Sequence, residues 1–422
     1  MFDTSENYLQ DDGDDFITVD NSGTISLRDW QRRAKKYFFE HDNNALFTVT
    51  TGAGKTYIAI DIINDVLYNN PGTRVLIIVP KNVILESGWY KELTDYGFPI
   101  QDIGVYYGNI KEFSTITLTN MQNIHKIPLE MFQMLILDEA HNYSTPRMLE
   151  YIKHPFEYRL GLTATLSFSD GKHLELLKTF GYNTFVYDPK EALDDGILNP
   201  FDFYNIGLSL DSQSFNEYTL LSQQLTNTLK IGGGYNTLMK SNNKLKLKML
   251  SLINERKKLV NNYEEKFEVA KQIIVNNRDK KIIVFNQFNS QTSKLYWHLL
   301  EEDVNCRVMH SGIKHSKREQ DLIDFKNNKY NVLLTSKVLD EGYNLPKLDM
   351  AIIMAGDNTD KQTIQRMGRV LRKKKGITSK LYQIYCKNTI EEDASVERSK
   401  IFKALSSDYR DIHHIPGMNL DV

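Results

Sequence analysis

The sequence predicts an α/β protein made of two units, each with a parallel sheet that helices cover on both faces. Short apolar segments alternate with helical segments along most of the 422 residues, which is the pattern of parallel strands joined by helices. The apolar segments are continuous rather than alternating with polar residues, and this is typical of strands buried on both faces. The pattern occurs twice, so we expect two sheets. The expected strands are 45–50, 74–80, 116–119, 134–137 and 159–163 in the first unit, and 281–285, 307–310, 331–335, 350–354 and 381–385 in the second.

Three regions are expected along the chain: an acidic N-terminal segment (1–26), a first lobe (27–198) and a second lobe (199–422). In the N-terminal segment, two β-like stretches flank Asp20-Asn21-Ser22-Gly23, which predicts a hairpin; the alternative is an unstructured tail. The second lobe includes a largely helical stretch, 212–277, that three glycines interrupt at 232–234. Residues 240–281 carry twelve Lys or Arg against five Asp or Glu, either a solvated helical face or a footprint for a polyanion.

Composition places the chain among ordinary cytoplasmic proteins. Hydrophobic residues make up 41 % and charged residues 25 %, and no apolar run approaches the ~20 residues of a membrane-spanning helix. The first 15 residues hold six acidic residues and no Lys or Arg, unlike a secretory signal. Cys306 and Cys386 stand far apart, so neither a disulfide framework nor a zinc site is expected. The net charge of −2 by itself argues against a nucleic-acid partner.

A phosphate-binding loop is predicted where the first expected strand ends. Thr51-Gly52-Ala53-Gly54-Lys55-Thr56 follows that strand and precedes an apolar helix, which is the context of a P-loop. Glycines let backbone N–H groups turn toward phosphate oxygens, Lys55 would reach the outer phosphates, and the Thr56 hydroxyl would ligate Mg²⁺. Val49 departs from the full pattern, which has glycine there. The alternative is a glycine turn that only joins strand to helix.

A second acidic element fits the first. The expected strand 134–137 ends in Asp138-Glu139-Ala140-His141. A carboxylate at the carboxyl end of a neighbouring parallel strand can meet the Mg²⁺ of a P-loop, and Asp138 is the candidate. Glu139 would orient or deprotonate an attacking water, whereas the alternative is an ordinary acidic strand end.

Together these motifs resemble the superfamily 2 helicases and translocases of the DEAH type, over about 27–388. The segment 27–31 resembles the adenine-contacting element, 51–56 motif I and 138–141 motif II. Further along, 163–165 resembles motif III, 338–342 motif V and 365–372 motif VI. The resemblance implies two tandem RecA-like lobes with an ATP cleft between them, ATP and Mg²⁺ as cofactors, and DNA as the partner.

The resemblance also implies a role for individual residues. The expected catalytic residues are Lys55, Glu139, Gln365, Arg369 and Arg372, the last two as arginine fingers. The expected nucleotide contacts are Arg28, Gln31, Thr51, Gly52, Ala53, Gly54, Lys55, Thr56, Asp340 and Gly342, with Thr56 and Asp138 on the metal. Coupling of hydrolysis to movement falls to His141, Thr163 and Thr165. The expected nucleic-acid contacts are Pro80, Lys81, Asn82, Thr119, Asn120, Gln122, Asn286, Gln287 and Thr335.

The predicted function is that of an ATP-dependent DNA helicase that unwinds or branch-migrates forked or junction DNA. The stretch 88–93 and the DEAH box resemble DNA-directed motors more than the DEAD-box RNA family, and the small size resembles phage UvsW-like branch-migration helicases. The latter resemblance implies a monomer that serves replication, recombination or repair, in the host cytoplasm if a phage encodes it. The alternatives are a duplex translocase without strand separation, an RNA helicase, or a catalytically idle scaffold. With the motifs in view, the net charge no longer excludes DNA, because the acid gathers at 1–20 and the base at 28–36, 240–281 and 369–375.

Overall fold

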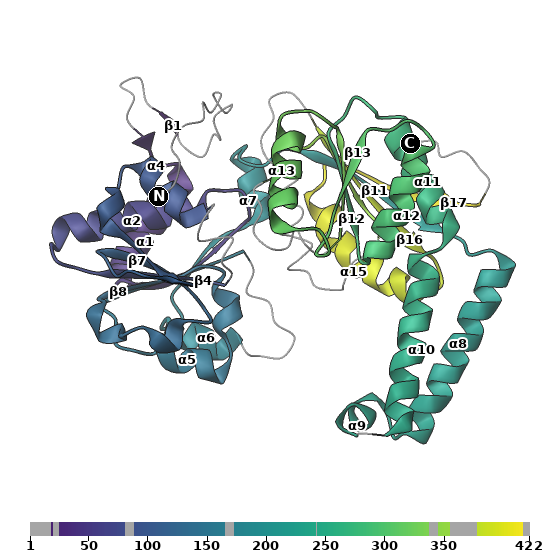
Figure 1. Ribbon diagram of the computed structural model, residues 1–422, viewed down its shortest axis with the longest axis horizontal. Coiled ribbons are helices and arrows are strands. Elements are labelled where there is room, and N and C mark those ends of the chain that lie inside the picture. Colours follow the sequence, from purple (N-terminus) through teal and green to yellow (C-terminus); the bar gives the residue numbers. More distant parts are fainter. Residues whose placement is uncertain are drawn as a thin grey trace. The chain divides into compact units, whose positions relative to one another are not determined.

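The computed structural model divides into two compact units, Met1–Leu198 and Asn199–Val422, each of which is described by itself (Figure 1). The residues that it describes are 18–19, 25–80, 88–164, 173–241, 243–336, 345–354 and 378–416. Near the N-terminus, β1 (Thr18–Val19) pairs antiparallel with β2 (Ile25–Ser26), as the hairpin prediction requires.

The first unit is built on an eight-stranded sheet of order β10-β3-β9-β8-β4-β7-β5-β6. Every pair of neighbours is parallel except β5 and β6. All five predicted strands are present, and their buried apolar side chains explain why the sequence revealed them. The strands are β3 (Asn44–Val49), β4 (Val75–Val79), β5 (Ile103–Tyr107), β6 (Ile110–Lys111), β7 (Ile116–Asn120), β8 (Met134–Leu137), β9 (Tyr158–Thr163) and β10 (Thr184–Tyr187).

Helices cover both faces of this sheet, as expected for a parallel sheet. Figure 1 shows α1 and α2 on one side, and α5 and α6 on the other. The helix α2 contributes Ile58, Ile62 and Ile63 to the core, and Asp138 and Glu139 separate β8 from the 3-10 turn η5. The helical elements are α1 (Asp29–Glu40), α2 (Lys55–Asn69), α4 (Tyr90–Tyr96), η2 (Ile100–Asp102), η3 (Ile124–Lys126), η4 (Leu129–Met131), η5 (Ala140–Tyr143), α5 (Pro146–Ile152), α6 (His173–Thr179) and α7 (Pro189–Asp194).

The second unit has a seven-stranded, fully parallel sheet of order β13-β14-β12-β15-β16-β11-β17. The five predicted strands are again present, whereas β11 and β17 were not expected. The strand β17 reads Asp-Tyr-Arg-Asp-Ile-His-His, a polar sequence that only the edge of a sheet tolerates. The strands are β11 (Phe201–Leu208), β12 (Ile282–Asn286), β13 (Cys306–Met309), β14 (Val332–Ser336), β15 (Met350–Ile353), β16 (Ser379–Cys386) and β17 (Asp408–His414).

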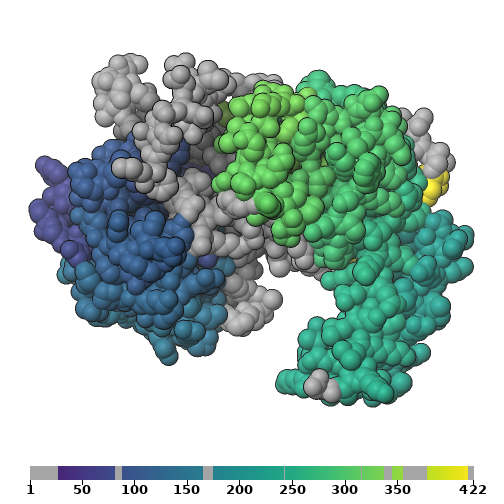
Figure 2. All heavy atoms as spheres, viewed as in Figure 1, coloured from purple at the N-terminus to yellow at the C-terminus, as the bar shows by residue number. Residues whose placement is uncertain are grey.

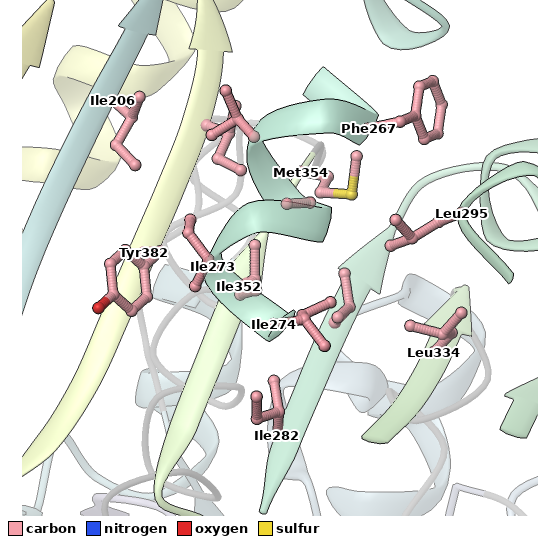
Figure 3. Packing of buried hydrophobic residues seen from close by; sticks show 14 of the residues in the cluster. Ile206, Phe267, Ile273, Ile274, Ile282, Leu295, Leu334, Ile352, Met354 and Tyr382 are labelled. Atoms are coloured by element: carbon pink, nitrogen blue, oxygen red, sulfur yellow. The ribbon is translucent and has the colours of Figure 1, made fainter. Parts of the chain in front are cut away.

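A large core cluster of the second unit lies between its sheet and α11. Figure 3 shows Phe267, Ile273 and Ile274 of this helix among Ile282 and Ile352 of the strands, and all five are buried. Burying such side chains stabilises the unit by about 1.5–3 kcal/mol each. The helices are α8 (Ser212–Ile231), α9 (Tyr235–Lys240), α10 (Lys244–Asn261), α11 (Glu264–Val275), α12 (Asn289–Leu300), α13 (His315–Lys326) and α15 (Ile390–Leu405).

The helices α8, α9 and α10 form an arm, residues 212–261, that extends away from the sheet of the second unit (Figures 1 and 2). A small core of its own, Leu225, Leu238, Met249 and Leu252, holds the three helices together. The predicted break at the three glycines separates α8 from α9. The predicted helical stretch 212–277 therefore splits in two, because its last helix, α11, belongs to the main core instead. Among the described helices, none has the length and apolar character needed to cross a membrane.

Candidate nucleotide site and nucleic-acid surfaces

The P-loop lies between β3 and α2, where the sequence predicted it. Gly52 and Gly54 have φ angles of 86° and 93°, a left-handed backbone that glycine adopts without strain. The helix α2 begins at Lys55, so its N-terminal N–H groups and helix dipole favour an anion at the loop. The buried hydroxyls of Thr50 and Thr51 have no hydrogen-bond partner. Bound phosphate would satisfy these hydroxyls, so the loop fits the predicted nucleotide.

Gln31 ties the start of α1 to this loop. Its side-chain oxygen accepts a hydrogen bond from the backbone N–H of Arg28 at 2.9 Å, and its amide nitrogen donates to the Gly54 carbonyl at 3.3 Å. The side chain is fully buried, next to Trp30, which stacks on Tyr187. Both ends of the Gln31 amide therefore bind the protein in this structure, and its role as a base reader stays a prediction.

Asp138 follows β8 and is buried. Its Oδ2 accepts a hydrogen bond from the indole N–H of Trp89 at 3.0 Å, and its Oδ1 accepts one from the backbone N–H of Glu139 at 2.9 Å. Burial raises the pKa of the Asp138 carboxyl above its usual value, although the positive charge of Lys55 opposes the shift. Both oxygens of the carboxylate thus accept hydrogen bonds at the carboxyl end of a strand, an arrangement that is common among carboxylates that bind metals.

A chain of polar contacts connects the predicted motifs I, II and III. The Lys55 ammonium lies 2.7 Å from Glu139 Oε1, and the other oxygen of Glu139 lies 3.4 Å from His141 Nδ1. The same ring nitrogen of His141 lies 2.9 Å from the Thr163 hydroxyl at the end of β9. Glu139 has a φ angle of 49°, an unusual backbone for a residue other than glycine and one that often marks functional sites. The structure therefore brings four predicted site residues together from three strand ends.

The predicted nucleic-acid contacts of the first unit differ in exposure. The Thr119 hydroxyl donates to the Tyr106 carbonyl at 2.9 Å, and Asn120 Oδ1 accepts from the backbone N–H of Asn123 at 3.0 Å. Thr119 and Asn120 are buried, whereas Gln122 is exposed and Pro80 is partly exposed. The polar groups at the end of β7 thus bind within the protein, and Gln122 is the side chain that a nucleic acid can reach.

The predicted contacts of the second unit lie at the ends of β12 and β14, which pair in parallel. Asn286 is fully buried with neither amide atom hydrogen-bonded, and the buried Thr335 hydroxyl also has no partner. Gln287 accepts a hydrogen bond from the side chain of Asn261, the last residue of α10, at 3.3 Å. Unpartnered buried polar groups cost free energy, so this strand end has polar groups that a ligand or water would satisfy.

Eight predicted site residues lie outside the described residues, and their roles stay predictions: Lys81, Asn82, Thr165, Asp340, Gly342, Gln365, Arg369 and Arg372. Trp89 was missed as a site residue, although the sequence around it was noted in the resemblance. No local sequence pattern indicates the contact of Trp89 with Asp138, because the two residues are 49 positions apart.

A cluster that could hold a metal outside the nucleotide site consists of Glu264, Glu268 and His298. Each carboxylate lies 3.1 Å from a ring nitrogen of His298. Lys294 pairs with Glu264, and Lys271 with Glu268 at 2.7 Å. Because cations already balance both carboxylates, the cluster is a network of ion pairs.

Two family profiles match the chain. That of the res subunit of type III restriction enzymes matches residues 24–168, and that of the helicase conserved C-terminal domain matches residues 265–374. The first match contains the P-loop and Asp138 to His141. The chain has the two-part core of the superfamily 2 helicases. The resemblance that the sequence motifs indicated is thereby confirmed at this level.

Among its curated relatives is the DNA 3'-5' translocase XPB2 of Sulfurisphaera tokodaii, 28 % identical over 363 residues, or 83 % of this chain and 79 % of the relative. The DNA 3'-5' helicase XPB of Mycobacterium tuberculosis is 22 % identical over 388 residues, or 89 % of this chain but only 63 % of the relative. These comparisons do not support the finer resemblance to UvsW-like, DEAH-type enzymes.

Solved structures confirm the predicted fold class of two RecA-like lobes. The helicase domain of Pyrococcus furiosus Hef has a TM-score of 0.61 at 18 % identity, covering 85 % of this chain and 96 % of that one. Dbp5 of S. cerevisiae, bound to RNA and ADP BeF3, has a TM-score of 0.60 at 13 % identity, covering 92 % of this chain and 89 % of that one.

Proposed function

We propose that this chain is an ATP-driven DNA helicase or translocase. The observation that carries the proposal is the contact chain from Lys55 through Glu139 and His141 to Thr163. It links the residue that would hold the phosphates to the strand end that would transmit movement. The relatives named as DNA 3'-5' translocase and helicase favour DNA as the track.

Each residue of the contact chain has a task in this proposal. Lys55 would leave Glu139 for the outer phosphates of ATP, which frees the carboxylate to orient the attacking water. His141 lies within reach of both Glu139 and Thr163, so a change at the carboxylate reaches the end of β9. Bound Mg²⁺ would neutralise phosphate charge, with Thr56 and Asp138 as its protein ligands. The sequence of the second lobe adds Arg369 and Arg372, which would act as the arginine fingers in this proposal.

The arm would bind the DNA backbone. Residues 212–261 contain eight Lys or Arg against two Asp or Glu. Three lysines stand within the first five residues of α10, although the first turn of a helix favours acidic side chains and α10 has none there. Such a placement costs stability unless an anion lies nearby, and a DNA backbone supplies one.

An exposed aromatic side chain also supports DNA binding by the arm. Tyr235, beside the glycine break, is 51 % exposed, so its ring is not part of the core. An exposed ring on a basic arm is a feature on which a base can stack. We therefore place a strand-contacting surface at α9 and the start of α10.

We propose branched DNA as the specific substrate. The second candidate function is movement along duplex DNA without strand separation. The small two-lobe core resembles branch-migration enzymes, whereas the Sulfurisphaera relative is named a translocase. Nothing in the residues of the arm favours RNA over DNA.

A panel of nucleic acids tests both the motor activity and the preference for branched DNA. ATP hydrolysis is measured with single-stranded DNA, duplex, fork, four-way junction and RNA, together with release of a labelled strand from the fork. We expect DNA to stimulate hydrolysis, with the branched substrates strongest. Hydrolysis that is equal with and without nucleic acid would overturn the motor proposal. Stimulation without strand release would favour the duplex translocase.

A further inference from the structure

Trp89 contacts the predicted metal ligand through a single hydrogen bond. The residue immediately precedes α4, and its side chain is 1 % exposed. Its indole N–H donates to Asp138 Oδ2 at 3.0 Å. The hydrogen bond joins two separate segments of the first unit, so its formation depends on the fold and not on sequence proximity.

The other two tryptophans show that burial alone does not explain this bond. Trp30 is also fully buried, yet its indole nitrogen has no hydrogen-bond partner. Trp297 lies on α12 and is 63 % exposed. A buried tryptophan in this protein therefore does not need an acceptor, and the one at position 89 has a carboxylate.

The hydrogen bond from Trp89 helps to fix the orientation of the Asp138 carboxylate. One oxygen accepts from the Trp89 indole and the other from the Glu139 backbone, so the two donors fix the plane of the carboxylate. Each carboxylate oxygen can accept more than one hydrogen bond or metal contact, which leaves room for Mg²⁺ or its water. A donor on a ligating carboxylate is the arrangement that orients metal ligands in proteins.

We propose that Trp89 is a positioning residue that holds Asp138 in the orientation needed for nucleotide-bound Mg²⁺. This inference rests on the proposed function, because that function makes Asp138 a metal ligand. Phenylalanine would fill most of the same space but cannot donate, so the indole N–H is the group that matters. Loss of such a supporting hydrogen bond typically weakens metal binding or activity about 10- to 100-fold.

The test compares Trp89→Phe with the wild-type chain by calorimetric titration with ADP. Affinity is measured once with excess Mg²⁺ and once with a chelator. We expect the variant to bind ADP without Mg²⁺ as the wild type does. The gain in affinity that Mg²⁺ provides should fall about 10- to 100-fold. Trp297→Phe is the matched control, since it makes the same substitution at the exposed tryptophan and should keep the full gain.

Three further measurements separate positioning from stability. The three tryptophans give three indole N–H signals in an NMR spectrum of ¹⁵N-tryptophan-labelled protein. Asp138→Ala should shift the signal that Trp89→Phe removes, and should make that proton exchange faster with water. Thermal unfolding of Trp89→Phe shows whether the variant is folded, and Trp89→His, which retains a ring N–H, should restore part of the Mg²⁺ gain.

The outcomes are distinct. An unchanged Mg²⁺ gain in folded Trp89→Phe would overturn the positioning role and leave Trp89 as a packing residue. A chain that binds Mg²⁺ and ADP with a Trp89-dependent gain, but never responds to DNA, would leave this inference intact and refute the motor proposal.

Discussion

Neutralising the lysines at the end of the arm should reduce the salt dependence of DNA binding. The perturbation is the triple substitution of Lys240, Lys244 and Lys248 by Gln. All three side chains are exposed, and none forms an ion pair with the described part of the chain. Their positive charge is therefore available to phosphate groups.

The expected magnitude follows from counting charges. Each cation that neutralises a phosphate of duplex DNA contributes about 0.9 to the slope of log affinity against log salt. If all three lysines contact the backbone, the slope becomes shallower by about 2.7 on duplex and about 2.1 on a single strand, where each contributes about 0.7. Fluorescence anisotropy of a labelled fork, titrated at several salt concentrations, measures the slope.

A second triple substitution controls for net charge. Lys91, Lys329 and Lys400 are also exposed, but each already pairs with a carboxylate, at 2.6, 2.8 and 2.6 Å. Substituting these by Gln removes the same formal charge while leaving the arm intact, so the slope should stay near that of the wild type. Equal slopes for the two triple variants would refute the reasoning, because the arm would then act only through the total charge.

Four single substitutions test the rest of the molecule. Lys55→Ala should abolish nucleotide use, measured by ATP binding and hydrolysis, because the loop loses its phosphate-reaching cation. Glu139→Gln should still bind ATP but hydrolyse it about 10²–10⁴-fold more slowly, measured in a single turnover, because the water loses its base. Thr163→Val should keep most DNA-stimulated hydrolysis but lose strand release on a fork, because the hydroxyl contact with His141 is absent. Lys266→Met should destabilise the second unit by about 3–5 kcal/mol in urea unfolding, because it leaves the partly buried Glu391 carboxylate unpaired.

Each of these expectations has a contrary result. Hydrolysis by Lys55→Ala at the wild-type rate would remove the P-loop from the mechanism, and normal turnover by Glu139→Gln would remove the proposed base. Parallel losses of hydrolysis and strand release in Thr163→Val would indicate a structural defect instead of uncoupling. If Lys266→Met unfolds like the wild type, the ion pair with Glu391, at 2.6 Å, contributes nothing measurable.

The central strands were predictable because their sequences report burial directly. In β4 and β8 every residue is buried, and a run of apolar residues of that length suits a strand covered on both faces. The edge strand β17 was missed because most of its side chains are at least partly exposed, so its sequence resembles a loop. Its place beside β11 depends on pairing between residues about 200 positions apart, as in Asn205 with Asp411.

The candidate site was predictable where the functional residues belong to a motif of a few adjacent residues. Lys55 and Glu139 belong to such motifs, and the structure brings them together. The sequence could not show that Thr119 and Asn120 satisfy hydrogen-bonding groups of their own loop, since a polar residue at a strand end looks the same with or without a ligand. The contact of Trp89 with Asp138 was not predicted, because the two residues are distant in the sequence.

The charge distribution explains how a nearly neutral chain can still bind DNA. The arm carries an excess of six positive charges in 50 residues, so the other 372 residues carry 44 Lys or Arg against 52 Asp or Glu. Since exposed charges act over about 10 Å at ordinary salt, DNA responds to each surface separately and not to the sum of −2. An acidic remainder disfavours DNA on most of the surface while the arm attracts it, which directs the backbone to one face. A charge-neutral composition in a motor of this kind is therefore compatible with strong local attraction, provided that the basic residues are concentrated on one element.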